Sequence, residues 1–366
     1  MVGTGYLRLF IAVAAVPLVA LMQSCTADAE SLADISLPPG FVIETYASVP
    51  HARSLALGTH GTVFVSTRRK SVYAIVENDT GREVIELLSD LKTPNGIAFF
   101  DGDLYVAELS RIRRYRDVEQ HLRDMPAGEL LPVQLPGETH HGPRYIGVGP
   151  DGLLYVTIGV PCNVCVRDGF GQILRMNLDG SEPQVFATGV RNSVGMAWHP
   201  GTGDLWFTDN GRDMLGDDLP PDELNRAPAA GLHFGFPYCH AGDIPDPEFG
   251  AAANCADFTP PARKLGPHVA PLGLKFYTGK EFPLQYQGQI FIAEHGSWNR
   301  SKRIGYRISL VRLQDGEPVS YEVFAAGWLQ GQAVTGRPVD LLVLDDGSLL
   351  VSDDHAGKIY RIRFQG

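Results

Sequence analysis

The sequence predicts an all-β fold, a six-bladed β-propeller with one loop insertion rich in Pro, Gly and Asp between two blades. A phrase made of a turn glycine and a short β-rich run recurs six times, at spacings of 41 to 85 residues. Repeats of roughly 40 to 60 residues, each holding four short strands, are typical of propellers. The 41 glycines and 26 prolines among 366 residues exceed average usage of roughly 7% and 5%, and they fit a fold with many turns. A β-sandwich is the alternative, but sandwiches do not repeat one phrase six times.

The repeated phrase marks one strand in each blade. Its runs are mostly apolar on both faces, which predicts strands buried between two layers. The copies cover residues 61–66, 102–107, 152–157, 203–208, 288–293 and 347–352. Second apolar strands follow most copies, at 71–75, 111–115, 172–176 and 358–362. Residues 41–46 are expected to complete the final blade, which closes the ring and removes exposed sheet edges.

The widest spacing, between the fourth and fifth copies, contains the insertion, which we expect over residues 212–267. This stretch is rich in Pro, Gly and Asp. Long loops within a compact domain are usually functional, so the insertion is expected near a site.

The N-terminus reads as an export signal. The apolar run 9–22 is shorter than the roughly 20 residues that span a bilayer, and it fits the apolar core of a secretory signal over residues 1–24. Two processing sites follow: Cys25 closes an imperfect lipoprotein box and would be lipidated, and Ala29 ends an ordinary cleavage site. Either one predicts an exported, periplasmic protein, and only lipidation of Cys25 would attach it to the membrane. The propeller domain is expected over 38–366.

The five cysteines fit an oxidising compartment. With Cys25 assigned to processing, an even number remains, which predicts two local disulfides, Cys162–Cys165 and Cys239–Cys255. A tetrahedral zinc site at the first pair would need two further ligands, usually from a second close pair. The net charge of −11 argues against a nucleic-acid partner.

Four loops combine histidine, arginine, asparagine and acidic residues within this acidic protein. They cover residues 140–144, 189–197, 209–213 and 295–300. Propellers place ligands at the mouth of the central channel, on loops between strands. A mouth that combines a histidine with several arginines suits a small polyanion.

The stretches 37–41, 93–98, 189–197 and 296–300 together resemble the soluble sugar dehydrogenases that depend on pyrroloquinoline quinone (PQQ), the glucose/sorbosone dehydrogenase family. The last stretch resembles the sorbosone branch in particular. The resemblance covers nearly the whole chain after residue 38. It implies PQQ and calcium as cofactors and an aldose or aldehyde sugar as the small-molecule substrate, and it leaves the electron acceptor open.

The resemblance also implies roles for individual residues. His141 would be the general base that takes a proton from a sugar hydroxyl while hydride passes to the quinone, a role that suits a neutral imidazole near pH 7. His140 is the neighbouring alternative. Arg191 would stabilise negative charge on the reduced cofactor, and with Asn192 it would contact the quinone oxygens.

The remaining residues implied to bind the cofactors lie in several separate segments of the sequence. The backbone carbonyls of Gly211 and Arg212 would bind calcium, which prefers oxygen ligands and acts as a Lewis acid. Further cofactor contacts are expected from residues spread over three blades: Asn95, Trp298, Arg300, Arg303 and Arg307.

One position departs from the family pattern. The glucose-oxidising members carry an aspartate that orients the catalytic histidine, and Val160 stands at that position here. Either another acid or a backbone carbonyl of the Cys162–Cys165 loop must then orient His141. This departure weakens glucose as the expected substrate.

Two other functions fit the same scaffold. One is a calcium-dependent lactonase or similar hydrolase with metal-bound water as nucleophile. The other is a non-catalytic, exported binding propeller, because fold alone does not fix function. A set of arginines in the channel would separate the quinone enzyme from the hydrolase, because a polyanionic cofactor needs them and a lactone does not.

Overall fold

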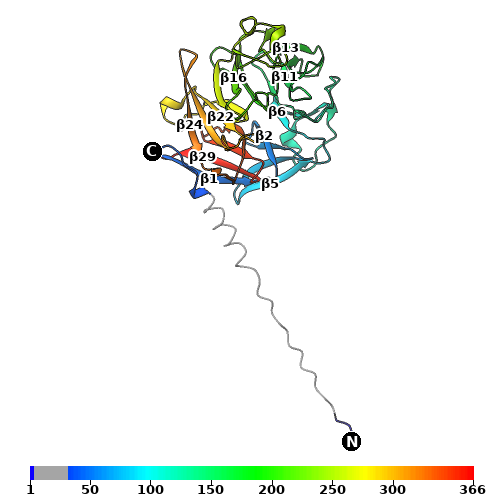
Figure 1. Cartoon of the computed structure of the whole chain (residues 1–366). Helices are drawn as coiled ribbons and strands as arrows, with labels where there is room; N and C mark the ends of the chain where they lie inside the picture. Colours follow the sequence, from blue (N-terminus) through cyan, green and yellow to red (C-terminus); the bar gives the residue numbers. More distant parts are fainter. Residues whose placement is uncertain (4–31) are drawn as a thin grey trace.

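The chain folds as a six-bladed β-propeller, as the sequence predicts (Figure 1). The computed structural model describes residues 1–3 and 32–366. Most of the predicted signal, Cys25 and Ala29 lie outside the described residues. Within that described part, no helix has the length and apolarity needed to cross a membrane.

Each blade is a four-stranded antiparallel sheet, and blade 3 carries a fifth strand. Blades 1 and 2 comprise β2 (Ala52–Leu57), β3 (Val63–Thr67), β4 (Val72–Asn78), β5 (Gly81–Leu88), β6 (Gly96–Phe100), β7 (Asp103–Ala107), β8 (Ile112–Tyr115) and β9 (Glu129–Leu130). Blades 3 and 4 comprise β10 (Ile146–Val148), β11 (Leu154–Ile158), β12 (Gln172–Met176), β13 (Gln184–Thr188), β14 (Met196–Trp198), β15 (Leu205–Asp209), β16 (Pro221–Ala227) and β20 (Arg263–Pro267). Blades 5 and 6 comprise β21 (Pro271–Phe276), β22 (Ile290–Glu294), β23 (Arg307–Gln314), β24 (Glu317–Ala326), β27 (Pro338–Val343), β28 (Leu349–Asp353), β29 (Lys358–Phe364) and β1 (Phe41–Ser48). The short hairpin β25 (Leu329–Gln330) and β26 (Ala333–Val334) precedes β27.

The repeated sequence phrase is the second strand of each blade. All five residues are buried in each of β3, β7, β11, β15, β22 and β28. The glycine that begins each phrase has φ between 73° and 89°, the left-handed region that glycine enters without steric cost. The innermost strands, β2, β6, β10, β14, β21 and β27, contact one another around the central axis. The predicted six repeats are therefore six blades.

The N-terminal strand closes the ring, as predicted. β1 pairs antiparallel with β29, from Phe41 opposite Phe364 to Ser48 opposite Lys358, and Figure 1 shows the two strands side by side. The Phe41 ring packs edge-on against four aromatic rings of blades 5 and 6, at centroid distances of 4.7 to 5.2 Å. Hydrogen bonding and aromatic packing thus hold the two chain ends in one blade.

The insertion is shorter than predicted. The expected range 212–267 contains β16 and β20, the third and fourth strands of blade 4, so the inserted segment is 228–262. β16 begins at Pro221 and β20 ends at Pro267. Proline is disfavoured inside strands and tolerated only at strand ends and edges, so these two segments did not resemble strands in the sequence. Within the insertion, β17 (Leu232–His233) pairs in parallel with β13, and β18 (Cys239–His240) pairs with β19 (Ile244–Pro245).

Both predicted disulfides are present. Cys162 bonds Cys165 in the loop after β11, and Cys239 bonds Cys255 within the insertion. Neither loop contains long regular strands, so the covalent links supply order that a hydrogen-bonded ladder supplies elsewhere.

Replacing Phe41 with alanine tests the closure. We expect F41A to lower the free energy of unfolding by about 3–5 kcal/mol, the usual cost of deleting a buried phenylalanine side chain, because Phe41 is 8% exposed among its four rings. Urea unfolding followed by fluorescence measures the difference. V42A is the matched control: Val42 is the next residue of β1 but is 36% exposed, so its cost should stay below about 1 kcal/mol. Equal losses in both variants would contradict closure by this packing.

Candidate functional site

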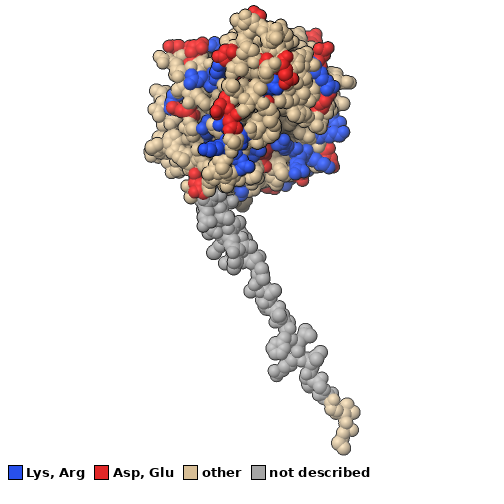
Figure 2. All heavy atoms as spheres, in the orientation of Figure 1, with Lys and Arg blue, Asp and Glu red and all other residues tan. Residues whose placement is uncertain are grey.

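A cavity of about 530 Å³ lies at one end of the propeller. Its walls are the segments that enter the innermost strands and the loops that leave the second strands. Its lining includes four arginines, four histidines and two aspartates. On the molecular face drawn in Figure 2, acidic and basic side chains lie interspersed.

Apolar side chains form part of the cavity wall. Val194 and Leu272 line it and pack with Val339 in one buried cluster. Buried Tyr145 and Asp340 also interact across the channel, with the tyrosine hydroxyl 3.4 Å from both carboxylate oxygens. A second cavity, of about 450 Å³, lies among the opposite ends of the innermost strands and has a mainly apolar lining that includes Lys275.

Asp209 fixes the Arg191–Asn192 turn. Its two carboxylate oxygens accept the backbone N–H groups of Arg191, at 2.7 Å, and Asn192, at 2.6 Å. Burial and the nearby Glu223 raise the pKa of Asp209 well above its usual range. Arg191 is 3% exposed and lines the cavity beside Asn192.

His141 also lines the cavity, with its ring held by a backbone carbonyl. Nδ1 lies 2.9 Å from the carbonyl oxygen of Val160. Because a carbonyl only accepts hydrogen bonds, Nδ1 carries the proton and Nε2 of the neutral ring keeps its lone pair. A Cβ at position 159 would lie 2.8 Å from His141 Cβ, so Gly159 permits this close approach. Of the two predicted alternatives, a carbonyl orients His141, but it belongs to Val160 itself and not to the Cys162–Cys165 loop.

The environment of His141 keeps its imidazole neutral. Burial, then the Arg191 guanidinium and His140, lower the pKa of His141 to about 2. The ring of His140 lies 4.1 Å from that of His141, and His140 is itself exposed. His141 is therefore unprotonated at neutral pH and can accept a proton at Nε2.

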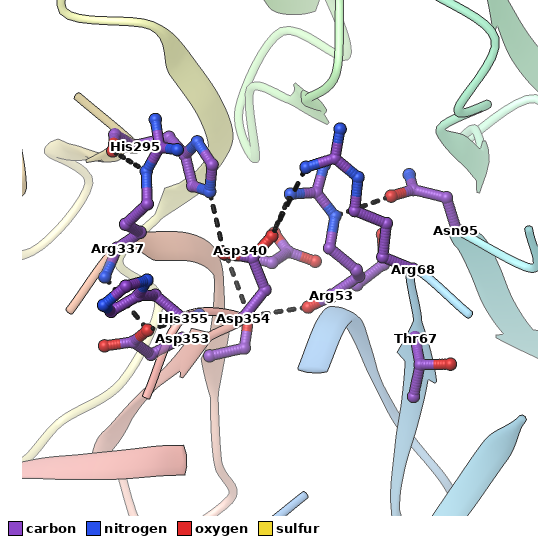
Figure 3. Close-up of polar contacts among 12 residues, drawn as sticks. Arg53, Thr67, Arg68, Asn95, His295, Arg337, Asp340, Asp353, Asp354 and His355 are labelled. Carbon is purple, nitrogen blue, oxygen red and sulfur yellow. Dashed lines mark hydrogen bonds and ion pairs between the residues drawn. The ribbon is translucent and has the colours of Figure 1, made fainter. Parts of the chain in front are cut away.

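A second histidine, His295, for which the sequence predicted no individual role, lies in the same cavity (Figure 3). His295 Nε2 is 2.8 Å from Asp354 Oδ1, and Arg53 Nη1 is 3.0 Å from Asp354 Oδ2. Burial raises the pKa of Asp354, but the hydrogen bonds and charges of these two partners outweigh it and hold that pKa well below its usual range. Burial lowers the pKa of His295 to about 4 against the opposing effect of Asp354. The neutral ring therefore donates from Nε2 and has a lone pair at Nδ1.

Three further arginines join Arg191 in the lining: Arg53, Arg68 and Arg337. Arg337 donates to the backbone carbonyls of His295, at 2.9 Å, and Gly296, at 2.8 Å (Figure 3). Among the described residues no carboxylate forms an ion pair with Arg337. The side chain of Arg68 is 58% exposed and lies 4.0 Å from Asp354. The cavity therefore holds positive charge that its carboxylates do not fully neutralise.

The arginines predicted to contact the cofactor, Arg300, Arg303 and Arg307, are not among the residues that line the cavity. Nearby polar groups bind each of them outside the cavity. Arg300 bonds the carbonyl of Asp217 and the carboxylate of Asp218, Arg303 bonds Gln332, and Arg307 pairs with Glu294 at 2.7 Å.

Of the two predicted cofactor contacts Asn95 and Trp298, the second lines the cavity and the first does not. Asn95 is buried and does not line the cavity; its Oδ1 accepts from Arg53 Nε at 2.7 Å, and its amide donates to the Arg144 carbonyl at 2.7 Å. It therefore supports Arg53, as Figure 3 shows. Trp298 does line the cavity and is 67% exposed, which leaves its ring face available at the rim.

The predicted calcium ligands lie in the loop after β15. Gly211 lines the cavity, and its N–H donates to Asp222 at 2.7 Å. The Arg212 side chain pairs with Asp246 and Glu248, which leaves only its backbone for the predicted role. No protein donor bonds either backbone carbonyl among the described hydrogen bonds. Residues 1–3 and 32–366 contain no group of three or more His, Cys, Asp or Glu side chains that could hold a metal.

Buried Asp222 lies close to these carbonyls in the lining. Both of its oxygens accept backbone N–H groups, from Gly211 and from Ala270 at 2.9 Å. Burial raises the pKa of Asp222 to about 7, so a cation bound at these carbonyls would favour its ionised form.

Two of the residues without a predicted role occupy the same place in their repeats. Asp354 directly follows the second strand of blade 6, and His295 directly follows that of blade 5. Aligning the repeats would have marked these two positions as equivalent. The arginines could not be found in this way, because Arg53 lies within β2, Arg337 directly precedes β27, and Arg191 lies further ahead of β14.

Comparisons with known proteins agree with this fold. A family model described as TrAA12-like matches residues 174–365. An uncharacterised protein of Borreliella burgdorferi is 33% identical over 365 residues, which cover 94% of this chain and 95% of that protein.

Two solved structures share the fold. The holo form of the pyranose dehydrogenase PQQ domain from Coprinopsis cinerea superposes with a TM-score of 0.79 at 20% identity, over 90% of this chain and 97% of that one. The calcium structure of a Trichoderma reesei carbohydrate-active enzyme of family AA12 gives a TM-score of 0.80 at 21% identity, with the same coverage. Because the family model matches more than half of the chain, this protein belongs to the TrAA12-like family.

Proposed function

We propose that the protein is a PQQ- and calcium-dependent dehydrogenase that oxidises an aldose or aldehyde sugar. The observation that carries the proposal is the pairing of a neutral, oriented histidine with four arginines in one cavity. The relatives support it, since the Coprinopsis cinerea structure is named a pyranose dehydrogenase PQQ domain. The Trichoderma reesei structure is named a calcium structure of family AA12.

The cavity fits a compact, multiply anionic cofactor. Its volume of about 530 Å³ lies within the range of roughly 300–1,000 Å³ that small-molecule sites occupy. Arg337 is bonded only to backbone carbonyls, so a cofactor carboxylate would supply the counter-charge that the described residues do not. Arg53, Arg68 and Arg191 would hold the same group, because planar guanidinium forks suit carboxylates.

The backbone carbonyls of Gly211 and Arg212 fit a calcium ion. Calcium takes oxygen ligands, including backbone carbonyls, and these two are free of protein donors among the described hydrogen bonds. Asp222 would balance the added charge. Bound there, calcium would act as a Lewis acid toward a neighbouring oxygen.

Oxidation of the alcohol breaks one C–H bond and one O–H bond, and a different acceptor takes the hydrogen of each. When bound, PQQ supplies an electrophilic quinone that takes up the hydride of the alcohol carbon. His141 Nε2 accepts the hydroxyl proton, and the Val160 carbonyl stabilises the resulting imidazolium through Nδ1–H. Arg191 stabilises negative charge beside it. Trp298 offers an apolar ring face to the sugar at the rim. The carbon–oxygen single bond becomes a carbonyl.

His295 is the competing base, because its Nδ1 has no protein partner among the described hydrogen bonds. In that alternative Asp354 would stabilise the imidazolium, as carboxylates do in catalytic dyads. The two histidines reach the cavity from different blades, so single variants can separate them.

We also propose export, and the periplasm as the compartment. The two disulfides support it, because disulfides persist in oxidising compartments. Lipidation of Cys25 is part of the same proposal and rests on the sequence alone.

Reconstitution tests the activity. Purified protein mixed with calcium and PQQ should reduce a dye in the presence of a sugar from an aldose panel. We expect H141Q to lower kcat by about 10²- to 10⁴-fold, the usual contribution of a general base, while PQQ affinity stays near the wild-type value. H295Q is measured alongside. A larger loss of kcat in H295Q would move the base to His295, and absence of PQQ binding at micromolar concentration would refute the proposed function.

The arginine set gives a second test. R337Q should raise the Kd for PQQ by about 10- to 100-fold, because a hydrogen bond to a charged group contributes about 1.5–3 kcal/mol. R300Q is the matched control, since Arg300 is bound to Asp217 and Asp218 outside the lining. Quenching of tryptophan fluorescence reports both affinities. A weaker affinity in R300Q than in R337Q would restore the arginines predicted from sequence.

The protonation of His141 gives a third test. Its pKa of about 2 lies far below the ordinary value of about 6.5, so the folded protein without cofactor keeps His141 neutral from pH 4 to pH 8. Its ring signals in NMR spectra, assigned by their loss in H141Q, should not titrate over that range. The unfolded chain takes up this proton as the pH falls below about 6.5, so His141 reduces folding stability in acid. A titration midpoint near pH 6.5 in the folded protein would contradict the buried geometry.

A further inference from the structure

We propose that Asn163, held by the Cys162–Cys165 disulfide, is the positioning residue for Arg191. Its consequence for catalysis rests on the proposed function, in which Arg191 contacts the quinone. The contacts themselves do not depend on that function. The Cys-Asn-Val-Cys motif, which the proposed chemistry leaves unused, thereby acquires a role.

Two oxygens of Asn163 accept hydrogen bonds along one edge of the Arg191 guanidinium. Its backbone carbonyl accepts from Arg191 Nε at 2.9 Å, and its side-chain Oδ1 accepts from Nη2 at 2.9 Å. Two parallel acceptors match the planar fork of arginine and fix its rotation as well as its position. A single residue therefore orients the guanidinium plane.

Two hydrogen bonds to the Asp213 backbone hold the Asn163 side chain in place. Asn163 Oδ1 also accepts the Asp213 N–H at 2.8 Å, and Asn163 Nδ2 donates to the Asp213 carbonyl at 3.1 Å. Asp213 Oδ2 then accepts from Arg191 Nη2 at 2.9 Å. The amide accepts at Oδ1 and donates from Nδ2, whereas an ionised carboxylate only accepts, so asparagine suits the position better than aspartate.

These bonds leave one guanidinium N–H for a ligand. A guanidinium has five N–H groups; the bonds to Asn163 and Asp213, with one from Nη1 to the Asn210 carbonyl at 3.1 Å, use four of them. The fifth, on Nη1, has no protein partner among the described residues. Because Arg191 lines the cavity while only 3% exposed, its orientation decides whether this N–H reaches a ligand.

The disulfide supplies order to a segment without strands. Residues 159–171 connect β11 to β12 as turns and bends, and the bond joins Cys162 to Cys165 around Asn163 and Val164. The same segment contacts the site upstream: the Val160 N–H donates to the Arg191 carbonyl at 2.9 Å, and the Val160 carbonyl orients His141. One segment, residues 159–171, thus supports both His141, through Val160, and Arg191, through Val160 and the disulfide-closed Asn163.

The first experiment needs no cofactor. In NMR spectra of the free protein, the Arg191 Nε–H signal, assigned by its loss in R191K, should be resolved and protected from solvent exchange. N163L, similar in shape but without hydrogen-bonding groups, and the double variant C162S/C165S should each accelerate that exchange at least tenfold. N163D keeps an acceptor oxygen for Arg191 and should retain most protection. V164A, in the same loop but without a bond to Arg191, is the matched control and should match the wild type.

The second experiment uses the PQQ- and calcium-loaded protein. N163L should lower kcat by about 10²-fold, the scale of a small misplacement of a catalytic group, with a much smaller change in KM for the sugar. N163D should recover most of kcat. Unchanged Arg191 exchange in both N163L and C162S/C165S would overturn the positioning role. Accelerated exchange in a protein that binds no PQQ would uphold that role and refute the proposed function instead.

Discussion

The cavity depends on the antiparallel pairing of β1 with β29, which joins the two ends of the chain in one blade. Closure places blade 6 against blade 1, and only then does Asp354 meet Arg53, 301 positions away in the sequence. The resulting group of Asp354, Arg53 and His295 draws on three consecutive blades around the closing seam. β1 also covers the outer edge of β29, and an unpaired strand edge is a template for association with another chain. The same pairing therefore secures both the fold and one wall of the cavity.

The fold follows from the sequence because one repeated constraint is visible in every blade. A glycine with positive φ and a fully buried strand must recur six times, and each recurrence has a recognisable composition. The limits of the insertion were not predictable in the same way. β16 and β20 begin or end in proline and carry polar residues, so their membership of blade 4 depends on neighbouring strands and not on their own pattern.

The site was only partly predictable, because acidic residues outside the cavity bind some of the arginines that the sequence predicted to line it. His141, Arg191, Asn192, Gly211 and Trp298 reach the cavity because the loops that carry them end at the axis. Arg300 and Arg307 are equally basic, but acidic residues of blades 4 and 5 neutralise them away from it. Arg53 and Arg337 resemble any other strand-end arginine in sequence. Their role becomes apparent only when ring closure and burial are known.

The contacts that cross the channel below the cavity have a consequence for the proposed oxidation. Val194 and Leu272 line the cavity and pack with Val339, and the Tyr145 hydroxyl contacts Asp340 across the channel. In the proposed dehydrogenase, the sugar and the electron acceptor would then approach through the same mouth. A shared mouth would favour double-displacement kinetics, in which the oxidised sugar leaves before the acceptor binds.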